Sequence, residues 1–276
     1  MLKEKMHVAV TTAFNEDESL DTVKTVQHIK RLYSKGVKSV LISGTTGEQH
    51  SLNLEEKMAL LDAINVEEEL TGKMEIIMGV SSVRQKDAEK LAKKISESNI
   101  SGIMLGFPPY IQPTQEEAMQ YSERLIELSN KPVILYNNSG RTGFDLSSDS
   151  IIYLSKSDSV IGIKDPGDQK KMAYLKKEIK KDFQFYAGGE IDLEKKVSWG
   201  YNRLSSIAGN IYPDEVKEWF DKLLNKDAGS DDGVEVWENI KYHIYEGNPI
   251  LNIKNILSEE YDETWLCRSP IGNAEN

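Results

Sequence analysis

Lys164 is the residue whose setting most clearly predicts chemistry. It ends the apolar run Val160-Ile161-Gly162-Ile163 and is followed by a turn at Asp165-Pro166-Gly167. Most other lysines lie in polar, helix-like stretches where water solvates the ammonium group. Burial at a strand end disfavours the ammonium form, and a neutral amine attacks carbonyl groups. Lys164 is therefore a candidate Schiff-base former. The alternative is a lysine whose stem packs on the strand while its head reaches water or a carboxylate.

Two other strand ends carry groups that could act with such a lysine. Gly44-Thr45-Thr46-Gly47-Glu48 is a turn whose backbone amides could hold a carboxylate or phosphate, although a plain turn with Thr caps has the same pattern. Tyr136 ends a second apolar run and can transfer protons beside a carbonyl. Arg141 follows on a Gly-flanked loop and can bind a carboxylate bidentately. A core tyrosine and a surface arginine are the alternatives.

Tyr110 lies at a further strand end, after Phe107-Pro108-Pro109, where it could cover a pocket or an interface. Together these positions place a neutralisable lysine, a tyrosine, an anion-binding turn and an arginine at one mouth. That set suits a 2-keto acid, because the turn would take its carboxylate, the lysine its carbonyl and the tyrosine its protons.

Eight short apolar segments must position these residues. They are His7–Phe14, Val37–Gly44, Met74–Val80, Gly102–Pro108, Pro132–Asn138, Val160–Pro166, Phe183–Gly189 and Arg203–Gly209. Several are near-continuous Val, Ile and Leu runs, which are typical of parallel strands buried on both faces. Segments with helical periodicity lie between them, including Thr22–Tyr33, Arg84–Ile95 and Gln115–Leu128. Eight such units predict an α/β fold, a (β/α)8 TIM barrel in residues 1–225, with functional residues after the strands. A doubly wound open sheet is disfavoured because no Gly-rich dinucleotide turn is present.

Residues 226–276 are predicted to form a small C-terminal helical extension. A polar linker, 227–233, precedes two helix-like stretches, Val234–Tyr245 and Pro249–Leu257, and proline suits a first helical turn. We expect this extension to pack on the barrel or on a neighbouring subunit.

Composition narrows the class of protein. The chain has 276 residues, a formal net charge of −11 and one cysteine, Cys267, which fits a reducing compartment. No apolar run approaches the ~20 residues that span a bilayer, and no signal-like segment follows the N-terminus, so a cytoplasmic location is predicted. The negative charge argues against nucleic-acid and anionic-membrane partners. The four histidines lack metal-ligand spacing, and no P-loop or dinucleotide motif occurs, so neither a metal nor a nucleotide cofactor is predicted.

The motifs at 44–48 and 136–143, with Gly162-Ile163-Lys164, resemble those of the dihydrodipicolinate synthase / N-acetylneuraminate lyase family of class I pyruvate-dependent aldolases. The resemblance runs from about His7 to the C-terminal end. It implies that Lys164 forms an imine with pyruvate, that Tyr136 assists and moves protons, and that Thr45 relays them. It also implies that the turn formed by Gly44, Thr45 and Thr46 holds the pyruvate carboxylate. The covalent imine would take the place of any cofactor.

The resemblance further implies that Tyr110 reaches a neighbouring subunit's site, so a homotetramer or dimer is expected. Arg141 matches an arginine that binds aspartate semialdehyde in the synthases and that the sialic acid lyases lack. This favours a lyase with 4-hydroxy-tetrahydrodipicolinate synthase activity, in lysine and diaminopimelate biosynthesis.

The chain also departs from the synthase pattern. Asn138-Ser139 replaces the usual Val-Pro, Asp165-Pro166 replaces Glu-Ala, and the strand with Ser205 is more polar. Ser205 is therefore a further candidate for substrate binding. These departures keep open an aldolase or dehydratase for a sugar-derived 2-keto acid, like N-acetylneuraminate lyase or 2-keto-3-deoxygluconate aldolase. A catalytically silent paralogue that binds a keto acid is the third reading.

Two further expectations concern residues around the turn. Leu54, Val83 and Pro109 occupy places where lysine-regulated members have polar or aromatic residues, so weak inhibition by lysine is predicted. Glu48 has no assigned role from the sequence, since it could cap the turn or orient Thr46.

Overall fold

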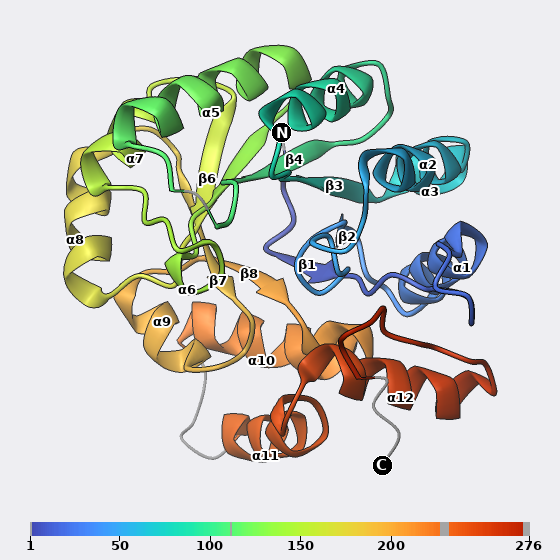
Figure 1. The fold of residues 1–276 in the computed structure, drawn as a ribbon. Coiled ribbons are helices and arrows are strands. Elements are labelled where there is room, and N and C mark those ends of the chain that lie inside the picture. The colour runs from blue at the N-terminus through green and yellow to red at the C-terminus, as the bar shows by residue number, and fades with distance from the viewer. Residues whose placement is uncertain (1, 111, 227–231, 273–276) are drawn as a thin grey trace.

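Eight parallel strands close into a barrel in the computed structural model, which describes residues 2–110, 112–226 and 232–272 (Figure 1). The strands are β1 (Met6–Ala9), β2 (Ser39–Ile42), β3 (Glu75–Val80), β4 (Gly102–Gly106), β5 (Val133–Tyr136), β6 (Val160–Lys164), β7 (Gln184–Gly188) and β8 (Arg203–Ser206). Each strand pairs with the next, and β8 pairs with β1 to close the barrel. The predicted TIM barrel is confirmed.

Helices follow the strands and surround the barrel. They are α1 (Thr22–Ser34), α2 (Leu54–Asn65), α3 (Glu68–Lys73), α4 (Gln85–Ser96), α5 (Gln115–Ser129), α6 (Ser139–Thr142), α7 (Ser148–Leu154), α8 (Gln169–Glu178), α9 (Leu193–Trp199), the 3-10 turn η1 (Ala208–Asn210) and α10 (Pro213–Asn225). Local chemistry fixes their starts: Asn53 with Glu56, and Thr114 with Glu117, form capping boxes at α2 and α5. In α4 the buried residues recur every three or four positions, which turns one face to the strands.

The first apolar segment is longer than its strand. The expected strand ran from His7 to Phe14, but β1 ends at Ala9. The apolar residues beyond it are still buried, and Phe14 forms an isolated antiparallel bridge with Leu20. The apolar run therefore reflects a buried loop as well as a strand.

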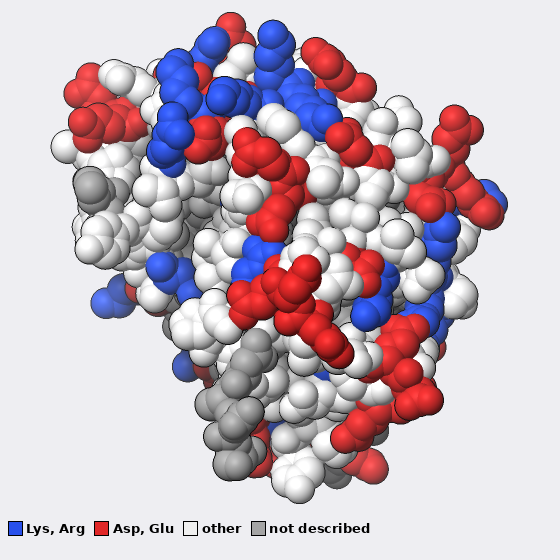
Figure 2. Space-filling view, turned by 45° about the vertical axis from the view of Figure 1, so that its right-hand side comes forward, with Lys and Arg blue, Asp and Glu red and all other residues white. Residues whose placement is uncertain are grey.

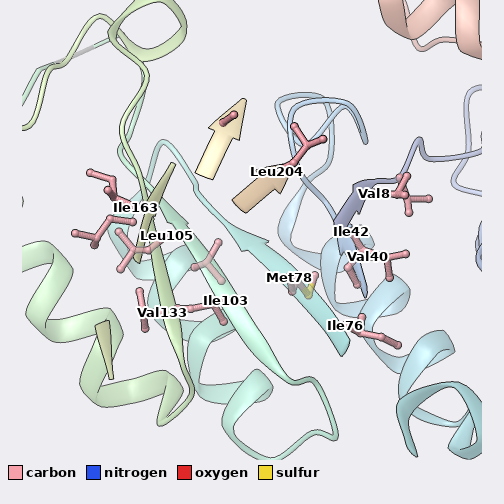
Figure 3. Packing of buried hydrophobic residues seen from close by; sticks show 14 of the residues in the cluster. Val8, Val40, Ile42, Ile76, Met78, Ile103, Leu105, Val133, Ile163 and Leu204 are labelled. Atoms are coloured by element: carbon pink, nitrogen blue, oxygen red, sulfur yellow. The ribbon is translucent and has the colours of Figure 1, made fainter. Parts of the chain in front are cut away.

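The core has two layers, one on each side of the strands. Outward-facing side chains such as Ile103, Leu105 and Val133 pack with the helices in the larger cluster (Figure 3). The smaller cluster fills the barrel interior with Leu2, Ala9, Leu41, Ile77, Met104, Ile134, Ile161 and Tyr186. Tyr136 packs against this inner cluster, so the barrel is a solid support beneath its C-terminal mouth.

The C-terminal extension consists of α11 (Asp232–Ile240), the π-helical turn η2 (Lys241–Tyr245) and α12 (Pro249–Tyr261). In Figure 1, α11 and α12 lie together beside α10. Of the predicted linker, residues 227–231 lie outside the described part of the chain, and Asp232 and Gly233 belong to α11 instead. Buried polar contacts join the extension to the barrel at Glu48 and Glu190. The expected packing of the extension on the barrel is therefore present.

No helix among the described residues is long and apolar enough to span a membrane. On the face in Figure 2, Lys and Arg side chains gather near the top with acidic side chains among them, and further acidic side chains run through the centre and down the right-hand side.

Candidate active site

The lysine and the tyrosine singled out in the sequence end two neighbouring strands. Tyr136 and Lys164 are register partners across β5 and β6, and Lys164 Nζ lies 5.4 Å from the centroid of the Tyr136 ring. Gly188, at the end of β7, leaves room for the lysine, since a Cβ there would stand 3.1 Å from Lys164 Cε. The barrel thus brings an amine and a phenol together at the ends of adjacent strands.

The amine of Lys164 is held by one hydroxyl. Its Nζ donates to Ser205 Oγ over 2.9 Å, and Ser205 is fully buried on β8. Burial lowers the pKa of Lys164 to about 8; Glu190 acts in the opposite direction, and Arg141 and Lys196 add to the lowering. A pKa near 8 leaves roughly a tenth of the amine neutral at pH 7, against roughly one part in three thousand for an ordinary lysine. The sequence-based expectation of a desolvated lysine is met by this environment.

Two side chains contact the Tyr136 hydroxyl. Thr45 Oγ1 lies 3.2 Å from it, and Asn138 Nδ2 donates to it over 3.2 Å. The Thr45 contact joins the turn after β2 to the end of β5. A chain of hydroxyls suited to proton transfer is therefore present in one protomer.

The turn after β2 has strained ends and free amides. Ser43 and Glu48 flank it with φ of 50° and 51°, a region that non-glycine residues rarely adopt. Thr12 Oγ1 donates to Gly47 O over 2.8 Å and fixes the turn against the loop that follows β1. The backbone amides of Thr45 and Thr46 have no acceptor within the described ranges. Two such amides beside each other can bind a carboxylate.

A cavity of about 570 Å³ opens at this mouth. Its lining includes Thr45, Thr46, Tyr136, Asn138, Lys164, Arg141 and Gly44, together with Gly247–Ile250 and Ile271 from the C-terminal extension. Arg141 is exposed on α6, and no carboxylate of the described residues pairs with its guanidinium. The cavity therefore contains a nucleophilic amine, a hydroxyl pair, free amides and an unpaired cation.

Two expected residues, Tyr110 and Ser205, and Glu48, which had no expected role, lie outside the cavity lining. Tyr110 is 93% exposed with φ of 85° and does not line the cavity. Ser205 also lies outside the lining and contacts Lys164. Glu48 is fully buried and faces the extension, where it accepts hydrogen bonds from Lys254 Nζ and from the Arg268 amide. Within this protomer, Glu48 therefore supports the turn from behind.

Comparisons with known proteins identify the family of this chain. The model of the dihydrodipicolinate synthetase family matches residues 3–276. The chain belongs to this family. The 4-hydroxy-tetrahydrodipicolinate synthase of Rickettsia felis is 31% identical over 253 residues, which cover 88% of this chain and 82% of that protein.

Solved structures show the same fold. Dihydrodipicolinate synthase DapA-2 from Bacillus anthracis superposes with a TM-score of 0.87 at 24% identity, covering 98% of this chain and 93% of that one. YagE, a prophage protein of this family from E. coli K12 solved in complex with pyruvate, gives a TM-score of 0.85 at 21% identity, covering 99% and 93%. As a family member, the chain is a class I, pyruvate-dependent aldolase, a lyase on a TIM barrel.

Two buried networks behind this aldolase site escaped the sequence reading. Glu190, after β7, accepts hydrogen bonds from Ser206 Oγ over 2.6 Å and from Tyr245 OH in the extension. Ser205 contacts Lys164, and the adjacent Ser206 contacts Glu190. The negative charge of Glu190 in turn acts to raise the pKa of Lys164. Tyr245 is 55 residues from Glu190, and no local pattern links them.

The second network ties β5 to the turn after β6. Asn137 Nδ2 donates over 2.7 Å to both Asp145 and Asp165, and its backbone amide donates to Lys164 O over 2.9 Å. Asp165 also accepts from Lys171 Nζ at 2.7 Å. The Asp165-Pro166 departure therefore supplies a buried acceptor that holds the lysine strand and the tyrosine strand together. Among the described residues, no His, Cys, Asp and Glu group has the arrangement of a metal site.

Proposed function

We propose that this aldolase condenses pyruvate with aspartate semialdehyde, the reaction of 4-hydroxy-tetrahydrodipicolinate synthase in lysine and diaminopimelate biosynthesis. The observation that carries the proposal is a low-pKa lysine that shares one cavity with a tyrosine and an unpaired arginine. The lysine supplies the imine, and the arginine supplies a second anion site for an aldehyde that carries a carboxylate.

In the proposed mechanism, neutral Lys164 adds to the pyruvate carbonyl and forms a carbinolamine. Tyr136 gives its proton to the hydroxyl, the C–O bond breaks, and the nitrogen lone pair forms the C=N bond as water leaves. The cationic imine then acts as an electron sink, so a methyl proton passes to the Tyr136 oxygen and an enamine forms. The enamine carbon attacks the aldehyde, the new alkoxide takes the proton that Tyr136 holds, and hydrolysis or transimination of the resulting imine breaks its bond to the lysine nitrogen and frees Lys164. Thr45 relays protons between Tyr136 and the cavity.

Binding would divide between two anion sites. The free amides of Thr45 and Thr46 suit the pyruvate carboxylate, which explains why this turn is held in a strained form. Arg141 suits the carboxylate of aspartate semialdehyde, since a guanidinium binds a carboxylate with two parallel hydrogen bonds.

The assembly is part of the proposal. Tyr110 is almost fully exposed in a conformation that disfavours non-glycine residues, and within the part of the protomer that the structure describes no hydrogen bond of its side chain compensates for that conformation. We propose that Tyr110 enters the site of a second copy in a homodimer or homotetramer. Sedimentation should then show at least a dimer, and Tyr110→Phe should lower turnover without changing the sedimentation coefficient.

Borohydride trapping tests the core of the mechanism. The protein is incubated with pyruvate, reduced with borohydride and analysed by mass spectrometry and peptide mapping. A single pyruvate-sized adduct on Lys164, absent from Lys164→Ala, is expected. Without such an adduct the imine mechanism fails, and a silent paralogue would be the better description.

Measured turnover rates distinguish the two proposed substrate classes. Pyruvate with aspartate semialdehyde is compared with a panel of sugar-derived 2-keto acids. Arg141→Leu should reduce turnover with aspartate semialdehyde by about a hundredfold or more, since a charged hydrogen-bonding partner is lost, while adduct formation with pyruvate continues. The second candidate is an aldolase or dehydratase for a sugar-derived keto acid, which the cavity of about 570 Å³ and the polar lining residues Gln49, Ser81 and Asn248 favour. Turnover of the sugar acids alone would establish it.

A further inference from the structure

The side chain of Asn138 donates a hydrogen bond to the phenol oxygen of Tyr136, the group proposed to transfer protons. Its Nδ2 lies 3.2 Å from Tyr136 OH, as close as Thr45 Oγ1 on the other side. An amide N–H can only donate, so Tyr136 accepts this bond and its own proton stays available to Thr45 or to a substrate atom. We propose that Asn138 is a positioning residue of the aldolase reaction, whose amide stabilises the charge on Tyr136 when that tyrosine gives up its proton. This inference rests on the roles proposed above for Lys164 and Tyr136.

The backbone holds Asn138 in this place. Its carbonyl oxygen accepts hydrogen bonds from the backbone amides of Arg141 and Thr142, both over 3.0 Å, at the start of α6. Thr142 Oγ1 adds a third bond to the same oxygen over 3.1 Å. The preceding residue, Asn137, is bonded to the carbonyl of Lys164. The side chain of Asn138 therefore starts from a rigid point on the loop that also presents Arg141.

The side chain of Asn138 is directed to the phenol of Tyr136. Asn138 lies two residues after the last residue of β5, with φ of −147° and ψ of 86°, and its Nδ2 reaches Tyr136 OH over 3.2 Å. Tyr136 and Asn138 both line the cavity. A valine or another apolar residue at 138 would offer no donor to the phenol oxygen, so asparagine adds a function that the rest of the loop does not supply.

The Asn138 amide would stabilise Tyr136 in two steps of the proposed reaction. When the carbinolamine loses water, Tyr136 transfers its proton to the departing hydroxyl and becomes a phenolate beside the Asn138 amide. When the methyl group loses a proton, that proton returns to the phenolate, and the C–H electron pair forms the C=C bond of the enamine. Hydrogen bonds to an anionic acceptor are about twice as strong as neutral ones, so the amide stabilises the phenolate more than the phenol.

Two nearly isosteric substitutions test the role. Asn138→Leu removes the donor, and Asn138→Asp replaces it with an anion at neutral pH. The readout is the exchange of pyruvate methyl protons for deuterium in heavy water, followed by NMR, which needs no aldehyde. Asn138→Leu should slow exchange about tenfold or more, with the pyruvate dissociation constant changed less than about twofold. Asn138→Asp should be slower still at pH 8, and its rate relative to the native protein should recover as the introduced carboxyl gains a proton and can donate.

Controls separate this inference from the proposed function. Ser139→Ala changes an exposed neighbour that does not line the cavity, and it should exchange at the native rate. If the native protein forms no adduct with pyruvate, the proposed function fails and the role of Asn138 falls with it. If the native protein forms the adduct but Asn138→Leu exchanges at the native rate, only the role of Asn138 is refuted. Equal slowing of the Leu and Asp variants at every pH, with lowered melting temperatures, would also refute it, since loss of packing alone would explain both.

Discussion

The rate of imine formation should follow the ionisation of Lys164. The perturbation is pH, because only the neutral amine attacks the pyruvate carbonyl. Burial brings the pKa of Lys164 to about 8, so its titration falls within a range that proteins tolerate. The pH profile of adduct formation should therefore bend near pH 8.

The size of the bend follows from the neutral fraction. With a pKa of about 8, the fraction of neutral Lys164 is roughly 9% at pH 7, 50% at pH 8 and 91% at pH 9. The rate should rise about fivefold between pH 7 and 8 and less than about twofold between pH 8 and 9. A lysine with an ordinary pKa would give nearly a tenfold rise in each interval, so the second interval discriminates best.

The assay mixes protein and pyruvate for a short fixed time, reduces the imine and quantifies the adduct on the Lys164 peptide. The chain offers an internal control in Lys57, whose pKa burial also lowers to about 8. Lys57 is buried, donates to Ser81 O over 2.8 Å and does not line the cavity. It should remain unlabelled, because a lowered pKa without access to the carbonyl gives no reaction.

Removing the negative charge of Glu190 provides a second test of the pH profile. Glu190 acts to raise the pKa of Lys164, so Glu190→Gln should move the bend below pH 8. A rate that keeps rising tenfold per unit through pH 9 would refute the reasoning about burial. An unchanged bend in Glu190→Gln would show that this carboxylate does not act on the lysine.

Three further predictions concern neighbouring features. Ser205→Ala removes the acceptor that holds Lys164 Nζ, so adduct formation should slow about five- to tenfold in rapid-quench measurements while the adduct stays on Lys164; a native rate would contradict the positioning role. Lys254→Met leaves the buried Glu48 carboxylate without its cation, so the free energy of unfolding measured in urea should fall by about 3–5 kcal/mol. Adding Glu48→Gln to the same chain should restore part of this loss. A loss below about 1 kcal/mol would contradict the prediction. L-Lysine should inhibit turnover weakly, since Leu54, Val83 and Pro109 offer it no polar partner, and inhibition at sub-millimolar lysine would count against that prediction.

Stability should also fall in acid because of two buried histidines. Burial lowers the pKa of His7 to about 3 and that of His28 to about 4, whereas both would titrate near 6.5 in the unfolded chain. The unfolded state therefore binds more protons as the pH falls below 6.5, and each histidine should cost roughly 1.4 kcal/mol per pH unit down to its folded pKa. Urea titrations between pH 7 and 4.5 measure this slope, which His28→Gln should reduce by about half; an unchanged slope would exclude His28 as a cause.

The sequence predicted the barrel and the meeting of Lys164 with Tyr136 at two strand ends, because both depend on local patterns. Near-continuous apolar runs mark buried parallel strands, and Lys164 and Tyr136 stand at the ends of two of them. Once the barrel closes in order, the register partners Tyr136 and Lys164 must meet. The turn at Thr45 was likewise visible as a Gly-flanked motif.

The remaining contacts join residues that no short pattern relates. Glu190 meets Tyr245, the last residue of the π-helical turn η2, across 55 residues, and Glu48 meets Lys254 across 206 residues. The bond from Asn138 to Tyr136 spans only two residues, yet it depends on the side-chain direction of a residue whose carbonyl is held at the start of α6. In the sequence, Asn138 stood out because it departs from the usual synthase motif. Its hydrogen bond to Tyr136 became apparent only in the structure.

The pairing of Glu48 has a consequence for how the protein is made. A ribosome adds Lys254 and Arg268 more than two hundred residues after Glu48. While the barrel strands emerge, the turn that carries Thr45 and Thr46 must wait with a carboxylate that has no cation to neutralise it. A nascent chain with all eight strands thus still lacks the two residues that contact Glu48 behind the turn. We expect the turn to gain this support only after α12 and the segment that follows it have been added.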